Sequence, residues 1–107
     1  MGITPGTTPT LTVVLDASIQ DCTAAELCIC CEGVRILKTL DDLRISPDGT
    51  EVSVKLTQQE TLLLPNDRIA LVQLRVLIGA SALATNVMQI QTKELLHRKE
   101  LTADANR

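Results

Sequence analysis

Hydrophobic and polar residues alternate along much of this chain with a period of two. The alternation is clearest at 50–56, where Val52, Val54 and Leu56 are separated by polar residues. Successive side chains of an extended strand point to opposite faces, so this pattern predicts a half-buried β-strand. Comparable segments bounded by turn signals lie at 10–16, 26–32, 34–40, 43–46, 50–56, 68–78 and 83–91. The pattern therefore predicts about seven strands.

The turn residues between these segments predict how neighbouring strands connect. Pro47-Asp48-Gly49 separates the fourth and fifth segments. Proline presets a turn and glycine tolerates positive φ, so we expect a hairpin there. Gly33 separates the second and third segments and predicts a tight turn or a bulge. Residues 79–82 predict a four-residue hairpin loop, and the irregular alternation of the last segment predicts a bulge within it.

One short helix is expected between the fifth and sixth strands. Residues 57–60 read Thr-Gln-Gln-Glu, which matches a capping box. In this motif the Thr57 hydroxyl accepts a hydrogen bond from an N–H of the first turn, and the Glu60 carboxylate accepts one from the Thr57 N–H. A helix of one or two turns should end at Leu62 or Leu63, before Pro65.

The longest predicted strand, 68–78, is apolar on both faces. One face carries Ala70, Val72, Leu74, Val76 and Ile78. The other face carries Ile69, Leu71, Gln73, Arg75 and Leu77. This pattern is typical of a central strand that is covered on both sides, here by the chain's own arms or by another subunit. We interpret the second set as a candidate protein interface, because apolar residues in excess of the core face a partner and arginine is enriched at interfaces.

Short strands at this spacing favour two packed antiparallel sheets over a closed barrel. The fold expected is an all-β sandwich of immunoglobulin-like architecture, with Greek-key connections and one short helix. Similarity to antibody domains is limited to architecture, because the chain has no Trp or Tyr. We divide the chain into an extended N-terminal arm at 1–9, a β-sandwich core at 10–91 and a C-terminal tail at 92–107, in which 92–96 predict a helical turn.

Composition narrows the classes of partner. The 107 residues carry a formal net charge of -3 and include no Phe, Trp or Tyr. A chain without excess Lys and Arg is poorly suited to neutralising phosphates, so we expect no direct nucleic-acid partner. Without aromatic side chains there is also no stacking platform for bases or sugar rings.

The chain shows no signal for export or membrane attachment. Its start lacks the basic residues and apolar stretch of a secretory signal. Gly6 stands where the myristoylation motif has Ser or Thr. The densest apolar run, 69–78, is interrupted by Gln73 and Arg75 and is too short to span a bilayer as a helix. We expect a soluble protein, without a membrane partner, that is made in the cytoplasm.

Four cysteines crowd into ten residues: Cys22, Cys28, Cys30 and Cys31. Soft thiolates favour zinc or iron–sulfur clusters, but structural zinc sites usually pair their ligands in two separated C-x2-C halves. In a strand at 26–32, Cys31 falls on the same face as Leu27 and Ile29, while Cys28 and Cys30 fall on the other. The four thiols should not converge, and we interpret them as small, reduced, structural side chains without a bound metal.

No arrangement of residues indicates catalysis. His97 is the only histidine and lies in the polar tail, and Asp41, Asp42, Asp48 and Asp67 have the positions of turn residues. No phosphate-binding or calcium-binding loop pattern is present. We therefore expect a non-enzymatic protein with no catalytic residue and no cofactor.

Several segments in a particular order resemble a known family. They are 46–52 (Ser-Pro-Asp-Gly-Thr-Glu-Val), 56–62 (Leu-Thr-Gln-Gln-Glu-Thr-Leu), 72–75 (Val-Gln-Leu-Arg), 84–87 (Ala-Thr-Asn-Val) and 94–96 (Glu-Leu-Leu). In this order they resemble small β-sandwich virion proteins of tailed phages and prophages of Gram-positive bacteria, including the amino-terminal domains of upper baseplate proteins. The resemblance covers roughly the last two-thirds of the core.

The resemblance implies a structural protein of the virion, made in the host cytoplasm. Its partners would be other virion proteins and further copies of itself, with a tail or baseplate position favoured. Capsid decoration and a head–tail connector are alternatives within the virion. A soluble intracellular module that binds one protein through a sheet face or the 79–82 loop is a second class of function, and a cysteine-based metal or redox protein is a third.

Overall fold

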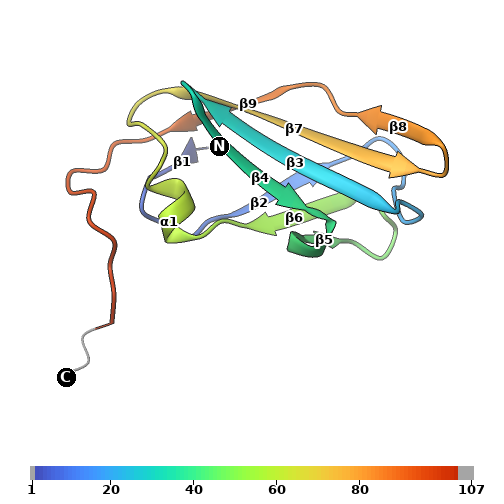
Figure 1. Cartoon of the computed structure of the whole chain (residues 1–107), viewed down its shortest axis with the longest axis horizontal. Helices are drawn as coiled ribbons and strands as arrows, with labels where there is room; N and C mark the ends of the chain where they lie inside the picture. Colours follow the sequence, from blue (N-terminus) through green and yellow to red (C-terminus); the bar gives the residue numbers. More distant parts are fainter. Residues whose placement is uncertain (1, 104–107) are drawn as a thin grey trace.

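The alternating segments form two sheets that pack face to face in the computed structural model, which describes residues 2–103 (Figure 1). The larger sheet has the order β1 (Gly2–Ile3), β9 (Met88–Thr92), β7 (Ile69–Ile78), β3 (Ala24–Cys31) and β4 (Val34–Thr39), with β8 (Ser81–Ala84) also paired to β7. The smaller sheet has the order β2 (Thr10–Val14), β6 (Glu51–Lys55) and β5 (Leu43–Ile45). A 3-10 turn, η1 (Leu40–Asp42), and one helix, α1 (Gln58–Thr61), complete the elements.

This arrangement confirms the predicted all-β sandwich. Each predicted strand is present, and the strand order within the sheets is that of an immunoglobulin-like sandwich, in which neighbours are often distant in sequence. Strand β1 was not predicted. It pairs with β9 in parallel, whereas the other strand pairs are antiparallel.

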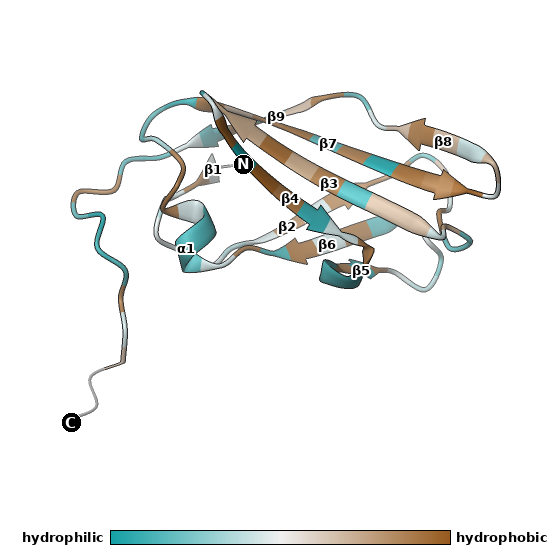
Figure 2. Cartoon of the chain, viewed as in Figure 1, coloured by the Kyte–Doolittle hydropathy of each residue, from teal (hydrophilic) through white to brown (hydrophobic). Residues whose placement is uncertain are grey.

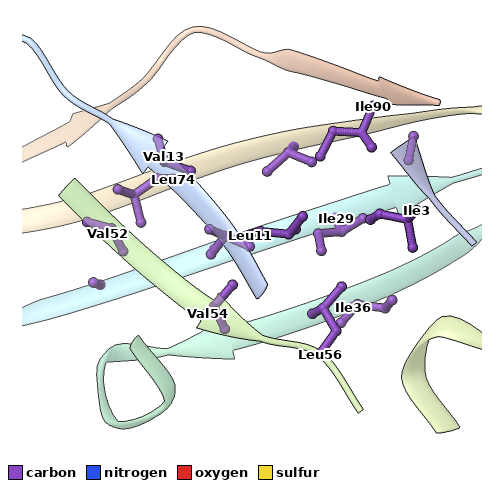
Figure 3. Close-up of a cluster of buried hydrophobic side chains, with 14 of the residues drawn as sticks. Ile3, Leu11, Val13, Ile29, Ile36, Val52, Val54, Leu56, Leu74 and Ile90 are labelled. Carbon is purple, nitrogen blue, oxygen red and sulfur yellow. The ribbon is translucent and has the colours of Figure 1, made fainter. Parts of the chain in front are cut away.

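The core lies between the inward faces of the two sheets. Figure 3 shows Leu11 and Val52 of the smaller sheet beside Ile29 and Leu74 of the larger one. Each of these four side chains is at most 3% exposed. Burying one Val, Leu or Ile side chain contributes about 1.5–3 kcal/mol, so these aliphatic contacts dominate the stability of the domain. Buried and exposed side chains thus alternate along these strands with the same period of two that predicted the strands.

Two predicted turns are confirmed. A two-residue loop, Glu32 and Gly33, joins β3 to β4 with φ of 45° and 86°, as a type I′ hairpin turn requires. The hairpin between β5 and β6 is organised by Asp48, whose Oδ1 accepts hydrogen bonds from the hydroxyls of Ser46 (2.7 Å) and Thr50 (2.8 Å) and from the Thr50 N–H (3.1 Å). These bonds favour the charged carboxylate and lower the pKa of Asp48.

The returning strand after β7 is shorter and more broken than predicted. Ile78 pairs with Ser81, so the hairpin loop contains two residues and the predicted four-residue loop at 79–82 is wrong. Arg75 pairs with Ala84, yet Val72 pairs with Met88. Two residues of β7 therefore oppose three residues at 85–87, which is the expected β-bulge. The bulge divides the predicted strand into β8 and β9.

Residues 2–9, which the sequence places in an extended arm, pack against the chain's own sandwich. Ile3 is 1% exposed within the core. The hydroxyl of the fully buried Thr61 accepts a hydrogen bond from the Gly6 N–H (3.0 Å) and donates one to the Thr7 carbonyl (2.7 Å). Thr61 thereby ties the N-terminal segment to α1.

The C-terminal segment continues from β9 without a helix. Thr92 is the last residue of β9 and is fully buried, so the predicted helical turn at 92–96 is wrong. Its hydroxyl accepts a hydrogen bond from the Arg68 N–H at 2.7 Å. Beyond it, residues 93–103 form neither helix nor strand, and Figure 1 shows them running past α1 and away from the sheets. Arg98 donates hydrogen bonds to the carbonyls of Leu62 and Leu64 on this path.

The predicted capping box begins α1. Thr57 Oγ1 accepts from the Glu60 N–H (3.1 Å), and Glu60 Oε1 accepts from the Thr57 N–H (2.8 Å). Glu60 also pairs with Lys38 of β4 at 2.7 Å, and this contact lets Lys38 be only 8% exposed. Burial alone would raise the pKa of Glu60, but hydrogen bonds from Lys38 and Thr57, with the Lys38 charge, outweigh it and lower the pKa.

The two turn glycines give a matched test of steric constraint. A Cβ at Gly49 would lie 2.2 Å from Ser18 Oγ and 2.8 Å from the Gln20 N, whereas nothing lies within 4 Å of one at Gly33. Both positions have positive φ, so Gly33→Ala should lower the free energy of unfolding by about 1 kcal/mol. Gly49→Ala should lower it by about 3 kcal/mol, because overpacking adds to that strain. Urea unfolding followed by far-ultraviolet circular dichroism measures both; equal losses would contradict this account.

The Lys38–Glu60 pair predicts a pH-dependent stability. Glu60→Gln keeps an acceptor for the capping box but removes the charge beside Lys38, and should lower the free energy of unfolding by about 1–2 kcal/mol at neutral pH. Because the pKa of Glu60 is lowered in the folded state, its contribution is present above the unfolded-state pKa and is lost as pH falls through the folded-state pKa. The difference from the wild type should therefore shrink in acid.

A control for this experiment is Glu51→Gln, at an exposed position of β6. It should leave the stability at neutral pH nearly unchanged. A Glu60→Gln deficit that stays constant across the acid range would exclude a contribution from the carboxylate charge.

Candidate functional site

Strand β7 places the five predicted interface residues together on the outer face of the larger sheet. Its even-numbered residues from Ala70 to Val76 are buried, and the intervening side chains point away from the core. Ile69, Leu71 and Leu77 are 48%, 43% and 37% exposed. Gln73 and Arg75 lie between them and are also exposed. That these residues form an interface remains a prediction.

The neighbouring strands extend this surface, which we call the outer face. It consists of the outward residues of the larger sheet: Ala24, Glu26, Cys28 and Cys30 of β3; Arg35, Leu37 and Thr39 of β4; Ile69, Leu71, Gln73, Arg75 and Leu77 of β7; Ala82 and Ala84 of β8; and Gln89 and Gln91 of β9. Leu77 lies between Ala24 and Ala82, so one end of the outer face is apolar. Ile69 and Leu71 form a second apolar area at the other end.

The polar residues at the centre of the outer face have partners within the chain. Arg75 pairs with Glu26 at 3.5 Å, in an exposed contact of the kind that adds little stability. Gln73 Nε2 donates to the Thr85 carbonyl at 3.0 Å, which helps to hold the bulge. A shallow hollow lies here, lined by Glu26, Cys28, Arg35, Leu37, Gln73 and Arg75.

The described parts of the two termini leave the outer face exposed. Strand β1 adds to the edge of the sheet beside β9, and residues 93–103 depart near α1 (Figure 1). In Figure 2 the hydrophobic colour runs along much of β7, β3 and β4 and is interrupted by hydrophilic segments. The sequence suggested that the second face of 68–78 is covered either by the chain's own arms or by another subunit. Within residues 2–103, the arms do not cover it.

The cysteines divide in the way that the strand alternation predicted. Cys31 lies in the core, 2% exposed, and Cys22 packs against the core from the loop before β3. Cys28 and Cys30 share the outer face, with their Sγ atoms 3.4 Å apart. Among residues 2–103, no group of three or more His, Cys, Asp or Glu side chains is placed to hold a metal ion.

The two thiols on the outer face differ in acidity. Hydrogen bonds from Cys28 and then from Arg35 lower the pKa of Cys30, because both stabilise its thiolate. Partial burial and the hydrogen bond to Cys30 raise the pKa of Cys28. Sequence reasoning missed this pair as a chemical site. The signal was the spacing of two residues, which puts both thiols on one face of a strand.

The other titratable residues considered from the sequence lie in separate parts of the structure, except for the adjacent Asp41 and Asp42. His97 is exposed in the C-terminal segment, and Asp41 and Asp42 lie in η1. A cleft at the edge between the sheets, beside β8, is mainly apolar, and Asp16 is the one ionisable group among its lining residues. This cleft lacks the paired acid and base that proton transfer would need.

Comparison with known proteins identifies no relative of this chain. No protein-family model matches the chain, and no match is found among the curated proteins or the solved structures. No helix in residues 2–103 is long and apolar enough to cross a membrane. The class that the structure defines is an all-β sandwich with an exposed, partly apolar sheet face.

Proposed function

We propose that this chain is a non-enzymatic structural protein of a tailed-phage virion that assembles through its outer face, with a tail or baseplate position favoured. The observation that carries the proposal is the exposure of Ile69, Leu71 and Leu77 on one regular strand. The ordered resemblance of segments from 46 to 96 to phage virion modules supplies the setting.

The outer face has properties that suit a protein partner. Two apolar areas flank a centre with Arg75, and arginine is enriched at interfaces. The backbone of β7 is hydrogen-bonded to β3 on one side and to β8 and β9 on the other. A surface held in this way is ordered before binding, which lowers the entropic cost of association. The net charge of -3 and the lack of aromatic side chains also favour protein over nucleic acid as partner.

The C-terminal segment is the arm available for contacts between copies. The N-terminal segment is already paired with β9 inside the same chain. In the C-terminal segment the side chains of Leu96 and Leu101 are 91% and 79% exposed, and among the described residues the main chain of Leu101 is held only by hydrogen bonds with the Gln58 side chain. An extended segment of this kind can add to the open edge of a neighbour's sheet through main-chain hydrogen bonds. Strand β4 ends the larger sheet and presents such an edge.

Substitution of the outer face tests the proposal. Leu71→Lys and Leu77→Lys should each weaken association about 100-fold, because each removes a buried leucine from the interface and places a charge there. Both positions are exposed in the single chain, so the variants should unfold in urea like the wild type. Val14→Lys, which makes the same kind of change at a 73% exposed position of the smaller sheet, is the control and should assemble normally.

The measurement is size-exclusion chromatography with light scattering under reducing conditions. Concentration must be read by refractive index, because the chain has no Trp or Tyr. A discrete wild-type oligomer that both leucine variants reduce to monomer supports the proposal. Unaltered assembly of both variants would exclude this face. A wild type that stays monomeric at all concentrations would overturn self-assembly and favour a module that decorates a partner's preformed surface.

A further inference from the structure

Cys28 and Cys30 form the one close pair of nucleophilic side chains that the described chain presents on its outer face. Their Sγ atoms are 3.4 Å apart, and neither thiol belongs to the core. Arg35 is the register partner of Cys30 across the β3–β4 ladder, so a guanidinium lies beside one thiol of the pair. The remaining cysteines are packed in or against the core. The short distance between their sulfur atoms and their position on the outer face thus distinguish Cys28 and Cys30 from the other two cysteines.

The environment gives the two thiols unequal roles. Contact with Cys28 and then the neighbouring Arg35 guanidinium lower the pKa of Cys30, which increases the fraction of thiolate, the reactive form. The pKa of Cys28 is raised, first by partial burial and then by its contact with Cys30, while Glu26 opposes and Arg35 favours its ionisation. At neutral pH Cys30 is therefore the better nucleophile, and Cys28 is the neighbouring thiol that can react in a second step.

We propose that Cys28 and Cys30 form a thiol–disulfide exchange site for small oxidised thiols of the glutathione type. The Cys30 thiolate attacks one sulfur of the small disulfide, whose S–S bond breaks and releases one thiolate. Cys28 then loses its proton and attacks Cys30 Sγ, which breaks the mixed disulfide and releases the second thiolate. The two protein thiols are oxidised to one disulfide, and the small disulfide is reduced to two thiols, which take up the two protons.

The position of the pair makes this disulfide easy to reverse. Residues i and i+2 of an antiparallel strand such as β3 lie about 6.8 Å apart, given a rise of about 3.4 Å per residue. That separation is near the upper limit for a disulfide, and bridges formed near this limit are more readily reduced. The site should therefore respond to the redox state of its surroundings. This inference concerns the single folded chain and does not depend on the proposed virion function; assembly through the outer face would cover both thiols, because Cys30 lies beside Leu71.

The test is the reaction of the reduced full-length chain with oxidised glutathione, quenched with acid and followed by intact mass. The wild type should pass through a mixed disulfide and end with one internal disulfide. Cys28→Ser should stop at the mixed disulfide, because the second step lacks its thiol. Cys30→Ser should react about tenfold more slowly, since the more ionised thiol is gone. Cys22→Ser is the matched control and should react like the wild type.

The site of modification can be read directly. Cleavage after glutamate releases residues 27–32, which separates Cys22 from the other cysteines, and fragmentation of that peptide then distinguishes Cys28, Cys30 and Cys31. Addition mainly at Cys22 or Cys31, disulfide-linked dimers as the main product, or a Cys30→Ser rate equal to the wild-type rate would each overturn the proposal. Urea unfolding of each variant verifies that the fold is retained.

A second readout tests the role of Arg35. The alkylation rate of Cys30 should rise with pH through a midpoint below the ordinary value for cysteine, and Arg35→Gln should move that midpoint upward. Arg35 acts as a positioning residue here, so its substitution should leave urea unfolding unchanged. A midpoint that does not move would remove the electrostatic basis of the proposed order of attack.

Discussion

The two sheets are held together by a core of aliphatic side chains to which Cys31 is the one addition among the described residues, and the rest of the structure depends on that contact. Without an aromatic ring to fill several positions at once, each inward position of each strand must supply its own branched or linear side chain. The need extends beyond the regular strands. Ile3 from the N-terminal segment and Leu56 and Leu64 from the residues around α1 are all at most 1% exposed. Short flanking segments therefore belong to the core of this domain.

Much of the fold could be predicted because its signals are local. The period of two identified the main strands, the residues around Asp48 identified a hairpin, and the capping box identified α1. The remainder depends on distant contacts. Strand β1 has two residues, too few to show a period, and exists because β9 offers it an edge. From the sequence alone, Lys38 would be expected at the surface. Its burial depends on its ion pair with Glu60, which is distant in sequence.

The candidate site was predictable to the same extent. Alternation put the five outward residues of β7 on one face, but their exposure depends on where the termini pack, which no local pattern encodes. The cysteines are a similar case. A spacing of two put Cys28 and Cys30 on the same side of β3. The approach of Arg35 to Cys30, however, depends on the β3–β4 register, and this register is set by the turn at Glu32 and Gly33.

The bulge at 85–87 determines which residues of β9 face the core. In β8 the odd-numbered residues face the core side, whereas in β9 the even-numbered Met88 and Ile90 do so. The extra residue thus changes the parity of the strand. If residues 84–91 continued in regular pairing without a bulge, the outward Gln89 and Gln91 would exchange sides with these apolar residues. Deletion of one residue from 85–87 would leave two residues opposite two, so the ladder would become regular while Met88 and Ile90 would still face the core side.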